Sequence, residues 1–400
     1  MCPGYDLELE DGWILALGKI ITSKHGKTLV TQATITGCPR SQLNGQNIIV
    51  KWSWVSPDRT FEADIIASAR RLAEEDCPKM LLHLPEIYHS QQCDGLVLPC
   101  RCQEILHGNS EDRILRVMIQ KELKPIQELE HPDMLAQAFK AIFGSHRHPG
   151  YRWLYEKAHI MHRDISVANL MFHEVDGKMY GVLNDFDHAL DFGKKSVPAS
   201  KQRTGTKPFM AIDLLLEPPE HLYRHDLESF LYVLVFLTCE TKQPFLKHPK
   251  DETTLQQWAE LAMLDLYYRK NAAITEGAFP PCKHGFDGFK VSITYLASLF
   301  GLGFGRRIMH GAEVRMAALR GTSVANFDDG TLGGAVTFDE FAACFKATTV
   351  PLMAHHIIVQ PPQNPSNPSS RRLPRSRASL GSAKRFNIPG NYYITLYNNL

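Results

Sequence analysis

The stretch HIMHRDISVANLM, residues 159–171, carries the pattern that decides the fold. It contains His-Arg-Asp at positions 162–164, and Asn169 follows Asp164 by five residues. Phosphoryl transfer requires an oriented acceptor and metal ions that neutralise the phosphates. A carboxylate at Asp164 can accept the proton of an acceptor hydroxyl, and the amide oxygen of Asn169 can bind a metal. Taken alone, the same stretch also fits a polar loop beside a capped helix.

A second stretch, VLNDFDHALDFG at residues 182–193, offers two candidates for a metal-binding aspartate. Asp191 stands in a literal Asp-Phe-Gly triplet, whereas Asp185 stands in Asp-Phe-Asp. Short apolar runs on either side of Asp176-Gly177 predict a hairpin whose second strand leads directly into Asp185. We expect no strand in front of Asp191. We therefore predict that Asp185 is the metal ligand and that the triplet at Asp191 is a coincidence.

The order of the predicted elements indicates an α+β protein with two segregated lobes, the first rich in strands and the second helical. The change falls near Lys121–Pro125, so we expect a first lobe at residues 10–122 and a second at 123–350. The predicted strands are Trp13–Ile21, Thr28–Ile35, Asn47–Trp54, Met80–Leu84 and Ile114–Ile119. The predicted helices are Phe61–Glu75, Met134–Phe143, Asp226–Thr238 and Thr254–Tyr268.

Composition and charge describe a globular chain with a distinct end. The 400 residues are 44% hydrophobic and 22% charged, with a net charge of +1 that gives no global attraction to nucleic acid. No acidic residue follows Glu340, while seven basic residues do, so the last part carries +7 and the remainder −6. Residues 351–400 are also rich in proline and serine, and we expect them to form a disordered basic tail.

Nine cysteines without paired spacing indicate free thiols in a reducing compartment. The histidines near residues 159–188 match no zinc motif, so no zinc site is expected. The opening residues, MCPGYDLELEDG, lack the basic and apolar regions of a secretory signal, and no apolar run is long enough to cross a bilayer. We expect an intracellular protein, cytoplasmic or nuclear, with no membrane or nucleic-acid partner evident and an oligomeric state that the sequence leaves open.

Several blocks in the same order resemble the fungal-type protein kinase family. They are HRDISVAN at 162–169, NDFD at 184–187, RTGTKPFMA at 203–211, HDLES at 225–229 and FDDGTLGG at 327–334. The resemblance extends over about residues 10–350. It implies the two-lobed protein kinase fold, with ATP and Mg²⁺ between the lobes. It also implies transfer of the γ-phosphate to Ser or Thr of a protein substrate, whose identity the sequence does not reveal.

The resemblance assigns the catalytic residues. Asp164 is expected to be the base, with Asn169 and Asp185 as the magnesium ligands. Arg163, beside the base, stands where many kinases hold a phosphorylated activation loop. In this chain Ser196, Ser200 and Thr204 are the candidate phosphorylation sites, whereas Thr206 is expected to contact the catalytic aspartate.

The nucleotide-binding residues are expected in the first lobe. Lys51 ends an apolar strand, where kinases place a lysine against the ATP phosphates, and Glu62 on the next helix would pair with it. Val30, after the loop that covers the phosphates, is expected to contact the nucleotide. Without the resemblance, a solvent-facing Lys51 and Glu62 would be the better interpretation.

Three departures from the kinase pattern leave other functions open. The loop that is normally glycine-rich has Gly26 alone, Ser166 replaces a frequent phosphate-contacting lysine, and Asp187 replaces the glycine of Asp-Phe-Gly. A pseudokinase that binds partners on the same fold is therefore the alternative. A small-molecule phosphotransferase is disfavoured by the activation segment, which ends near Asp213 and provides a platform for a polypeptide.

Overall fold

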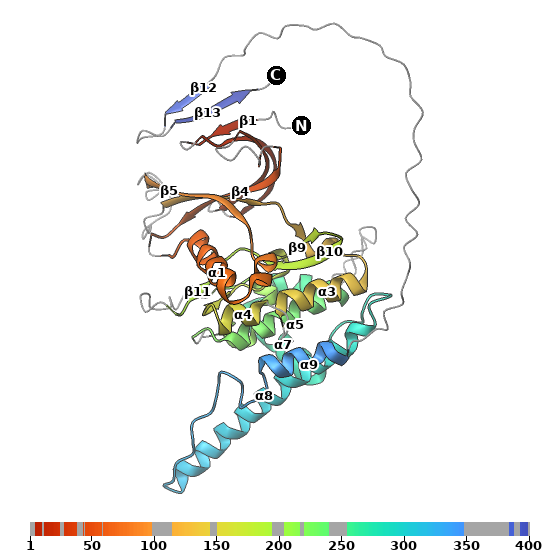
Figure 1. Cartoon of the computed structure of the whole chain (residues 1–400). Coiled ribbons are helices and arrows are strands. Elements are labelled where there is room, and N and C mark those ends of the chain that lie inside the picture. Colours follow the sequence, from red (N-terminus) through yellow and green to blue (C-terminus); the bar gives the residue numbers. More distant parts are fainter. Residues whose placement is uncertain are drawn as a thin grey trace. The chain divides into compact units, whose positions relative to one another are not determined.

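The computed structural model describes residues 5–9, 12–24, 28–37, 43, 45–57, 59–97, 114–144, 150–193, 204–216, 220–239, 254–347, 384–387 and 393–398. The chain forms two compact units (Figure 1). The first comprises Met1–Asp58, Tyr88–Glu122 and Pro351–Leu400, and the second comprises Arg59–Ile87 and Leu123–Val350. Strands dominate early in the chain and helices later, so the expected kinase-like α+β fold is confirmed.

The first unit is built on a sheet of eight strands in the order β12-β13-β1-β2-β3-β4-β6-β5. Its strands are β1 (Tyr5–Glu8), β2 (Ile14–Lys24), β3 (Thr28–Gly37), β4 (Asn47–Val55), β5 (Ile87–Val97), β6 (Ile114–Lys121), β12 (Lys384–Asn387) and β13 (Tyr393–Asn398). The four expected strands that correspond to β2, β3, β4 and β6 are confirmed. Their alternating residues, among them Leu15, Ile35, Val50 and Ile119, form a buried core on one face.

Two of these strands lie within the stretch that we expected to be a disordered tail. β12 and β13 pair antiparallel, and β13 pairs with β1 through Tyr5 and Asn398. The sequence of β13, YITLYN, is aromatic and β-branched, which favours a strand and explains the difference from the expectation. The rest of the tail, residues 351–383, 388–392 and 399–400, lies outside the described residues.

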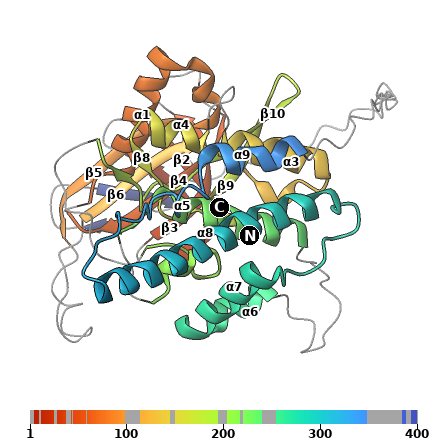
Figure 2. The same cartoon turned by 90° about the horizontal axis from the view of Figure 1, so that it is seen from below.

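The second unit surrounds one buried helix, α5 (Tyr223–Cys239). Its other helices are α1 (Glu62–Asp76), α3 (Pro132–Phe143), α4 (Tyr151–Glu156), α6 (Thr254–Glu260), α7 (Met263–Glu276), α8 (Gly288–Leu319) and α9 (Phe338–Ala347). Figure 2 shows α9 beside α3, where the rings of Phe341 and Phe143 lie 4.7 Å apart, and Phe143 also packs on Phe230 of α5. In the described ranges, no helix combines the length and the apolar character needed to cross a membrane.

A small sheet in this unit positions the predicted site. β9 (Leu170–Val175) and β10 (Lys178–Leu183) form the predicted hairpin, and β7 (Lys124–Pro125) pairs with β9. The turn residues Asp176 and Gly177 have φ values of 52° and 71°, as expected for a two-residue turn of this kind. Gly181 lets β10 approach α3, because a Cβ there would lie 2.3 Å from the carbonyl oxygen of Ala138. The hairpin is thus held on both sides, by β7 next to β9 and by α3 next to β10.

Three expected elements differ in the structure. The strand expected at Met80–Leu84 is a 3-10 helix at Pro78–His83, because a short apolar run after a proline is equally compatible with a helical turn. The helix expected at Thr254–Tyr268 divides into α6 and α7. Asp226 was expected to open its helix, but α5 starts three residues earlier at Tyr223.

Candidate active site

Asp164 lies in a loop between β8 (Ile160–Met161) and the 3-10 turn Val167–Asn169. One of its carboxylate oxygens accepts the backbone N–H and the hydroxyl of Thr206, both at 2.8 Å. The side-chain N–H₂ of Asn169 donates to the Asp164 carbonyl oxygen at 2.9 Å and lies 3.4 Å from its other carboxylate oxygen. All three side chains are at least partly buried. The two hydrogen bonds from Thr206 confirm its expected contact with the aspartate.

The side chain of Asp226, on α5, forms hydrogen bonds with the backbone of this loop. Its Oδ2 accepts the backbone N–H groups of His162 and Arg163, both at 3.1 Å, and the hydroxyl of Tyr151 at 2.7 Å. Its Oδ1 lies 2.8 Å from Nε2 of His221. Although burial alone would raise the pKa of Asp226, the positive charge and hydrogen bond of His221 and the backbone donors lower it. Asp226 thus anchors the backbone of this loop.

Arg163 adopts a left-handed backbone conformation, with φ of 68°, which non-glycine residues rarely adopt. Its buried guanidinium lies 3.4 Å from the hydroxyl of Thr204, and burial lowers its pKa. Ser196 and Ser200, the other candidate phosphorylation sites, lie outside the described residues. Of the three candidate phosphorylation sites, Thr204 is the one that lies within the described residues, and it contacts Arg163.

Asp185 follows the strand β10 after one intervening residue, Asn184, so the predicted hairpin does lead to it. The N–H of Asn184 donates to the carbonyl oxygen of Asn169 at 2.9 Å, which brings the end of the strand beside the catalytic loop. Asp185 has φ of 65°, and one carboxylate oxygen each from Asp185, Asp187 and Glu62 lie within 4.8 Å of one another. The N–H of Phe186 donates to Glu62 at 2.6 Å and so fixes α1 to this loop.

These oxygens suit a magnesium ion, because Mg²⁺ prefers hard carboxylate and amide oxygens to nitrogen or sulfur ligands. In Asn169 the amide nitrogen is engaged with Asp164, which leaves Oδ1 as the atom that can bind a metal. Asp185 and Asn169 therefore each offer an oxygen that could bind such an ion. The side chain of Asp187 brings a third carboxylate to the same place, where most kinases have glycine.

Asp191 lies in a different environment. Leu190 and Asp191 form the two-residue strand β11, which pairs with β8, so the expectation of no strand in front of Asp191 was wrong. Oδ1 of Asp191 accepts the N–H of Gly193 at 3.2 Å. Asp191 thus pairs with the strand that precedes the Asp164 loop, and among the described residues it is not part of the carboxylate cluster around Asp185.

Two residues near the site were missed by sequence reasoning. His188 is mostly buried, and its Nδ1 lies 3.4 Å from a guanidinium nitrogen of Arg59. Burial lowers the pKa of His188, while the negative charge of Asp164 acts in the opposite direction. Because arginine can only donate, Nδ1 of His188 is the acceptor and its ring is neutral. No spacing rule links residues 59 and 188, so the sequence carries no signal for this contact.

The predicted nucleotide-binding residues Lys51 and Val30 belong to the first unit. They are directly opposite each other in the β3–β4 ladder, and Lys51 is buried. Glu62 belongs to the second unit, so its pairing with Lys51 stays a prediction. The tip of the preceding hairpin, residues 25–27 with Gly26, lies outside the described residues.

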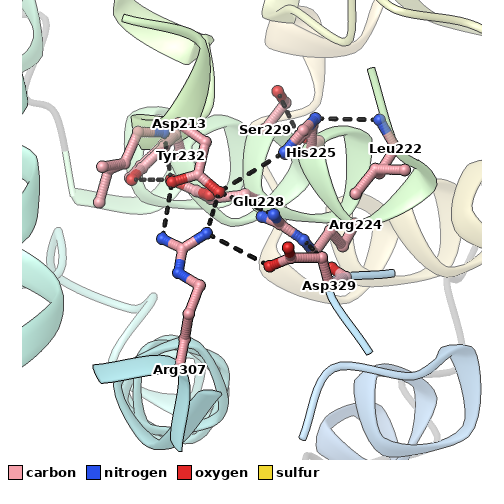
Figure 3. A network of polar contacts seen from close by, with 10 residues as sticks. Asp213, Leu222, Arg224, His225, Glu228, Ser229, Tyr232, Arg307 and Asp329 are labelled. Carbon is pink, nitrogen blue, oxygen red and sulfur yellow. Dashed lines mark hydrogen bonds and ion pairs between the residues drawn. The ribbon is translucent and has the colours of Figure 1, made fainter. Parts of the chain in front are cut away.

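A polar network lies under the end of the activation segment (Figure 3). Both carboxylate oxygens of Asp213 accept N–H groups of Arg307 from α8, at 2.7 and 2.8 Å, and Arg224 of α5 lies 2.7 Å from the same carboxylate. Burial favours the neutral acid, but the hydrogen bonds from Arg307 and the two positive charges hold the pKa of Asp213 well below its usual range. Asp213 is thereby fixed to two helices.

The neighbouring residues of the segment are held by buried groups. Glu228 accepts the N–H of Ile212 at 2.8 Å and the hydroxyl of Tyr232 at 2.6 Å, and burial raises its pKa to about 7. The ammonium of Lys270 donates to the carbonyl oxygen of Met210, lies 3.9 Å from the centre of the Tyr232 ring, and has its pKa lowered by burial to about 7. The segment is therefore held at three residues, through the backbone of Met210 and of Ile212 and through the side chain of Asp213.

Residues 85–238 match the family model described as fungal protein kinase. The matched stretch extends from β5 through the Asp164 loop and Asp185 to α5. It leaves out α1, which carries Glu62, and the partners of the polar network beyond residue 238. The matched family is the one that the sequence motifs resemble. No match was found among curated proteins.

Proposed function

We infer that the chain is an ATP-dependent protein kinase that transfers the γ-phosphate to Ser or Thr of a protein substrate. The inference starts from the match of residues 85–238 to the fungal protein kinase family. The observation that carries this proposal is the environment of Asp164. Thr206 orients one carboxylate oxygen, and Asn169, five residues later, is bonded to the same residue. The other oxygen of Asp164, 3.4 Å from the side-chain nitrogen of Asn169, would accept the proton.

In this mechanism Asp164 accepts the proton of the substrate hydroxyl as its oxygen attacks the γ-phosphorus and ADP leaves. Asn169 and Asp185 would hold Mg²⁺, which supplies charge neutralisation for the phosphates when it is bound with ATP. Lys51 and Val30 are the proposed contacts to the nucleotide, with Glu62 as the partner of Lys51. Arg163 positions the activation segment beside the base.

Support for a polypeptide acceptor comes from the activation segment. Its last residues, from Thr206 to Asp213, are fixed by hydrogen bonds to the catalytic aspartate, to α5, to α7 and to α8. A rigid backbone beside the base provides a surface on which an extended substrate can lie. A small-molecule acceptor would not require so much of the segment to be held.

The alternative is a pseudokinase that binds partners without efficient turnover. It is favoured by Ser166, which replaces a lysine that contacts the phosphates in many kinases, and by Asp187, which adds a negative charge beside Asp185. Like charges near a phosphate site weaken nucleotide binding unless a metal neutralises them. The two functions therefore differ in turnover rather than in fold.

The test is a pair of measurements on the full chain. Thermal unfolding with ATP, with and without Mg²⁺, measures binding, because a ligand that binds the folded state raises the melting temperature. Transfer of labelled phosphate to generic protein substrates, compared between the parent chain and Asp164→Asn, measures catalysis. Mg²⁺-dependent binding with no transfer above the Asp164→Asn background would favour the pseudokinase, and the absence of both would refute a kinase.

A further inference from the structure

The second half of α8 exposes a continuous apolar stripe. Exposed fractions are 51% for Leu302, 70% for Ile308, 63% for Met309, 48% for Met316 and 83% for Leu319. With 3.6 residues per turn these side chains, together with Gly305 and Ala312, fall within about one third of the helix circumference. The stripe extends over about 26 Å. Large contiguous apolar patches are uncommon on monomers and mark interaction surfaces.

The opposite side of α8 makes the contacts with its own unit. Arg307 is bonded to Asp213, a Cβ on Gly303 would collide with Leu332, and His310 lies 2.8 Å from the carbonyl oxygen of Ala325. In Figure 1 the end of α8 projects beyond the other helices of the unit, with the segment that precedes α9 alongside it. The stripe is therefore on the side of α8 that faces away from these contacts.

We propose that this stripe pairs with the same stripe of a second copy of the chain, with the two helices antiparallel. The positions 302, 305, 309, 312, 316 and 319 are spaced alternately by three and four residues, which is the seam of a helix pair. One antiparallel register is self-complementary. It sets Met309 opposite Ala312 of the second copy, Met316 opposite Gly305, and Leu302 opposite Leu319, so that each methionine meets a small residue.

The flanking charges agree with this register. Arg306 and Glu313 occupy the same edge of the seam, seven residues apart, and both are exposed. In the antiparallel register Arg306 of one helix faces Glu313 of the other, and two-fold symmetry repeats the pair. In a parallel pair the two copies of this edge lie on opposite sides of the seam, so Arg306 of one helix could not reach Glu313 of the other. Arg306 also donates to the carbonyl oxygen of Gly333, which holds its side chain in place and leaves further N–H groups for a carboxylate.

Analytical ultracentrifugation of the full chain over roughly 1 to 100 μM tests the pairing. We expect a reversible monomer–dimer equilibrium, and we expect Met309→Glu to raise the dissociation constant about tenfold or more because a charge would enter the seam. The matched control is Leu264→Glu, which places the same charge at a half-exposed leucine of α7. A chain that stays monomeric throughout, or a dimer that both variants leave intact, would overturn the proposal.

Two further variants test the register itself. A Cβ placed on Gly305 meets no neighbouring atom within 4 Å, and leucine favours a helix, so the Gly305→Leu monomer should remain folded. The new side chain should collide with Met316 of the partner copy and weaken the dimer. If the dimer formed by nonspecific hydrophobic association, the added leucine would strengthen it instead. The pair Gly305→Cys and Met316→Cys in one chain should give a covalent dimer on oxidation, whereas Met309→Cys alone should not, and the reverse result would refute the antiparallel arrangement.

Discussion

Thr206 donates both its backbone N–H and its hydroxyl to one carboxylate oxygen of Asp164, at 2.8 Å each. Two donors on one oxygen fix the rotation of the carboxylate, and the second oxygen, which lies 3.4 Å from the side-chain nitrogen of Asn169, is the one that we propose accepts the proton. Forty-two residues separate the pair in sequence. The placement of the proposed base therefore depends on the end of the activation segment.

Replacing the base should remove catalysis and spare binding. Asp164→Asn keeps an oxygen acceptor for Thr206 and loses the proton acceptor, so we expect turnover to fall by about 100- to 10,000-fold with little change in ATP affinity. Thr206→Val removes the hydroxyl bond and retains the backbone donor, and should give a smaller loss. Phosphate transfer and calorimetric ATP binding measure the two effects. Full activity in Asp164→Asn would place the base elsewhere.

The two aspartates of residues 182–193 should behave differently. Asp185→Asn should abolish Mg²⁺-dependent turnover, because Asp185 is in the carboxylate cluster with Glu62 and Asp187. Asp191→Asn should retain most of it, because Asp191 bonds to Gly193 beside β8. Turnover as a function of Mg²⁺ concentration is the measurement. If Asp191→Asn were inactive and Asp185→Asn active, the assignment of the metal ligand would be reversed.

The proposed pairing of Lys51 with Glu62 predicts coupled effects on nucleotide binding. Lys51→Met should weaken ATP binding, and Glu62→Gln should weaken it in the parent chain but add little in the Lys51→Met chain. Interacting residues show coupling energies of about 0.5 to 3 kcal/mol in such double-mutant cycles. Glu62→Gln is the suitable change because its amide oxygen can still accept the N–H of Phe186. Fully additive effects would argue against the pair.

His225 should make stability depend on pH. Its ring is fully buried, Nδ1 accepts the N–H of Leu222 at 3.0 Å, and burial lowers its pKa to about 4 from an ordinary 6.5. Between pH 6.5 and 4, His225 binds a proton in the unfolded chain but not in the folded chain. The free energy of unfolding should therefore fall as pH decreases from 6.5 towards 4. The full shift corresponds to about 3 kcal/mol at most. Urea unfolding between pH 4 and 7 should be flatter for His225→Gln, and an equal slope would contradict this assignment.

Arg163 should connect the base to the state of the activation segment. A phosphate carries a charge of about −1.5 to −2 and binds guanidinium strongly, so phosphorylation within residues 196–204 should raise activity through Arg163. Mass spectrometry of the protein from its native host identifies the modified residue, and Arg163→Ala should remove the activation. If this segment is never phosphorylated and Arg163→Ala stays fully active, Arg163 has a structural role with Thr204.

Sequence alone determined the parts of the site that depend on local spacing. The five-residue interval from Asp164 to Asn169 and the turn at Asp176-Gly177 fix short pieces of backbone, because turn residues and strand periodicity act within a few positions. The strand that leads to Asp185 and ends at Leu183 followed from the same local rules, and with it the preference for Asp185 over Asp191. The blocks that resemble the fungal kinases added the order of these pieces.

Only the tertiary structure decided which distant residues meet. The bond from Phe186 to Glu62 joins residues 124 apart, and the pair of Asp213 with Arg307 joins residues 94 apart. Neither has a spacing signal, because such contacts depend on how whole helices pack. The 3-10 helix at Pro78–His83 was missed for a related reason: a short apolar run has the same pattern in a strand and in a helical turn, and the surrounding packing selects between them.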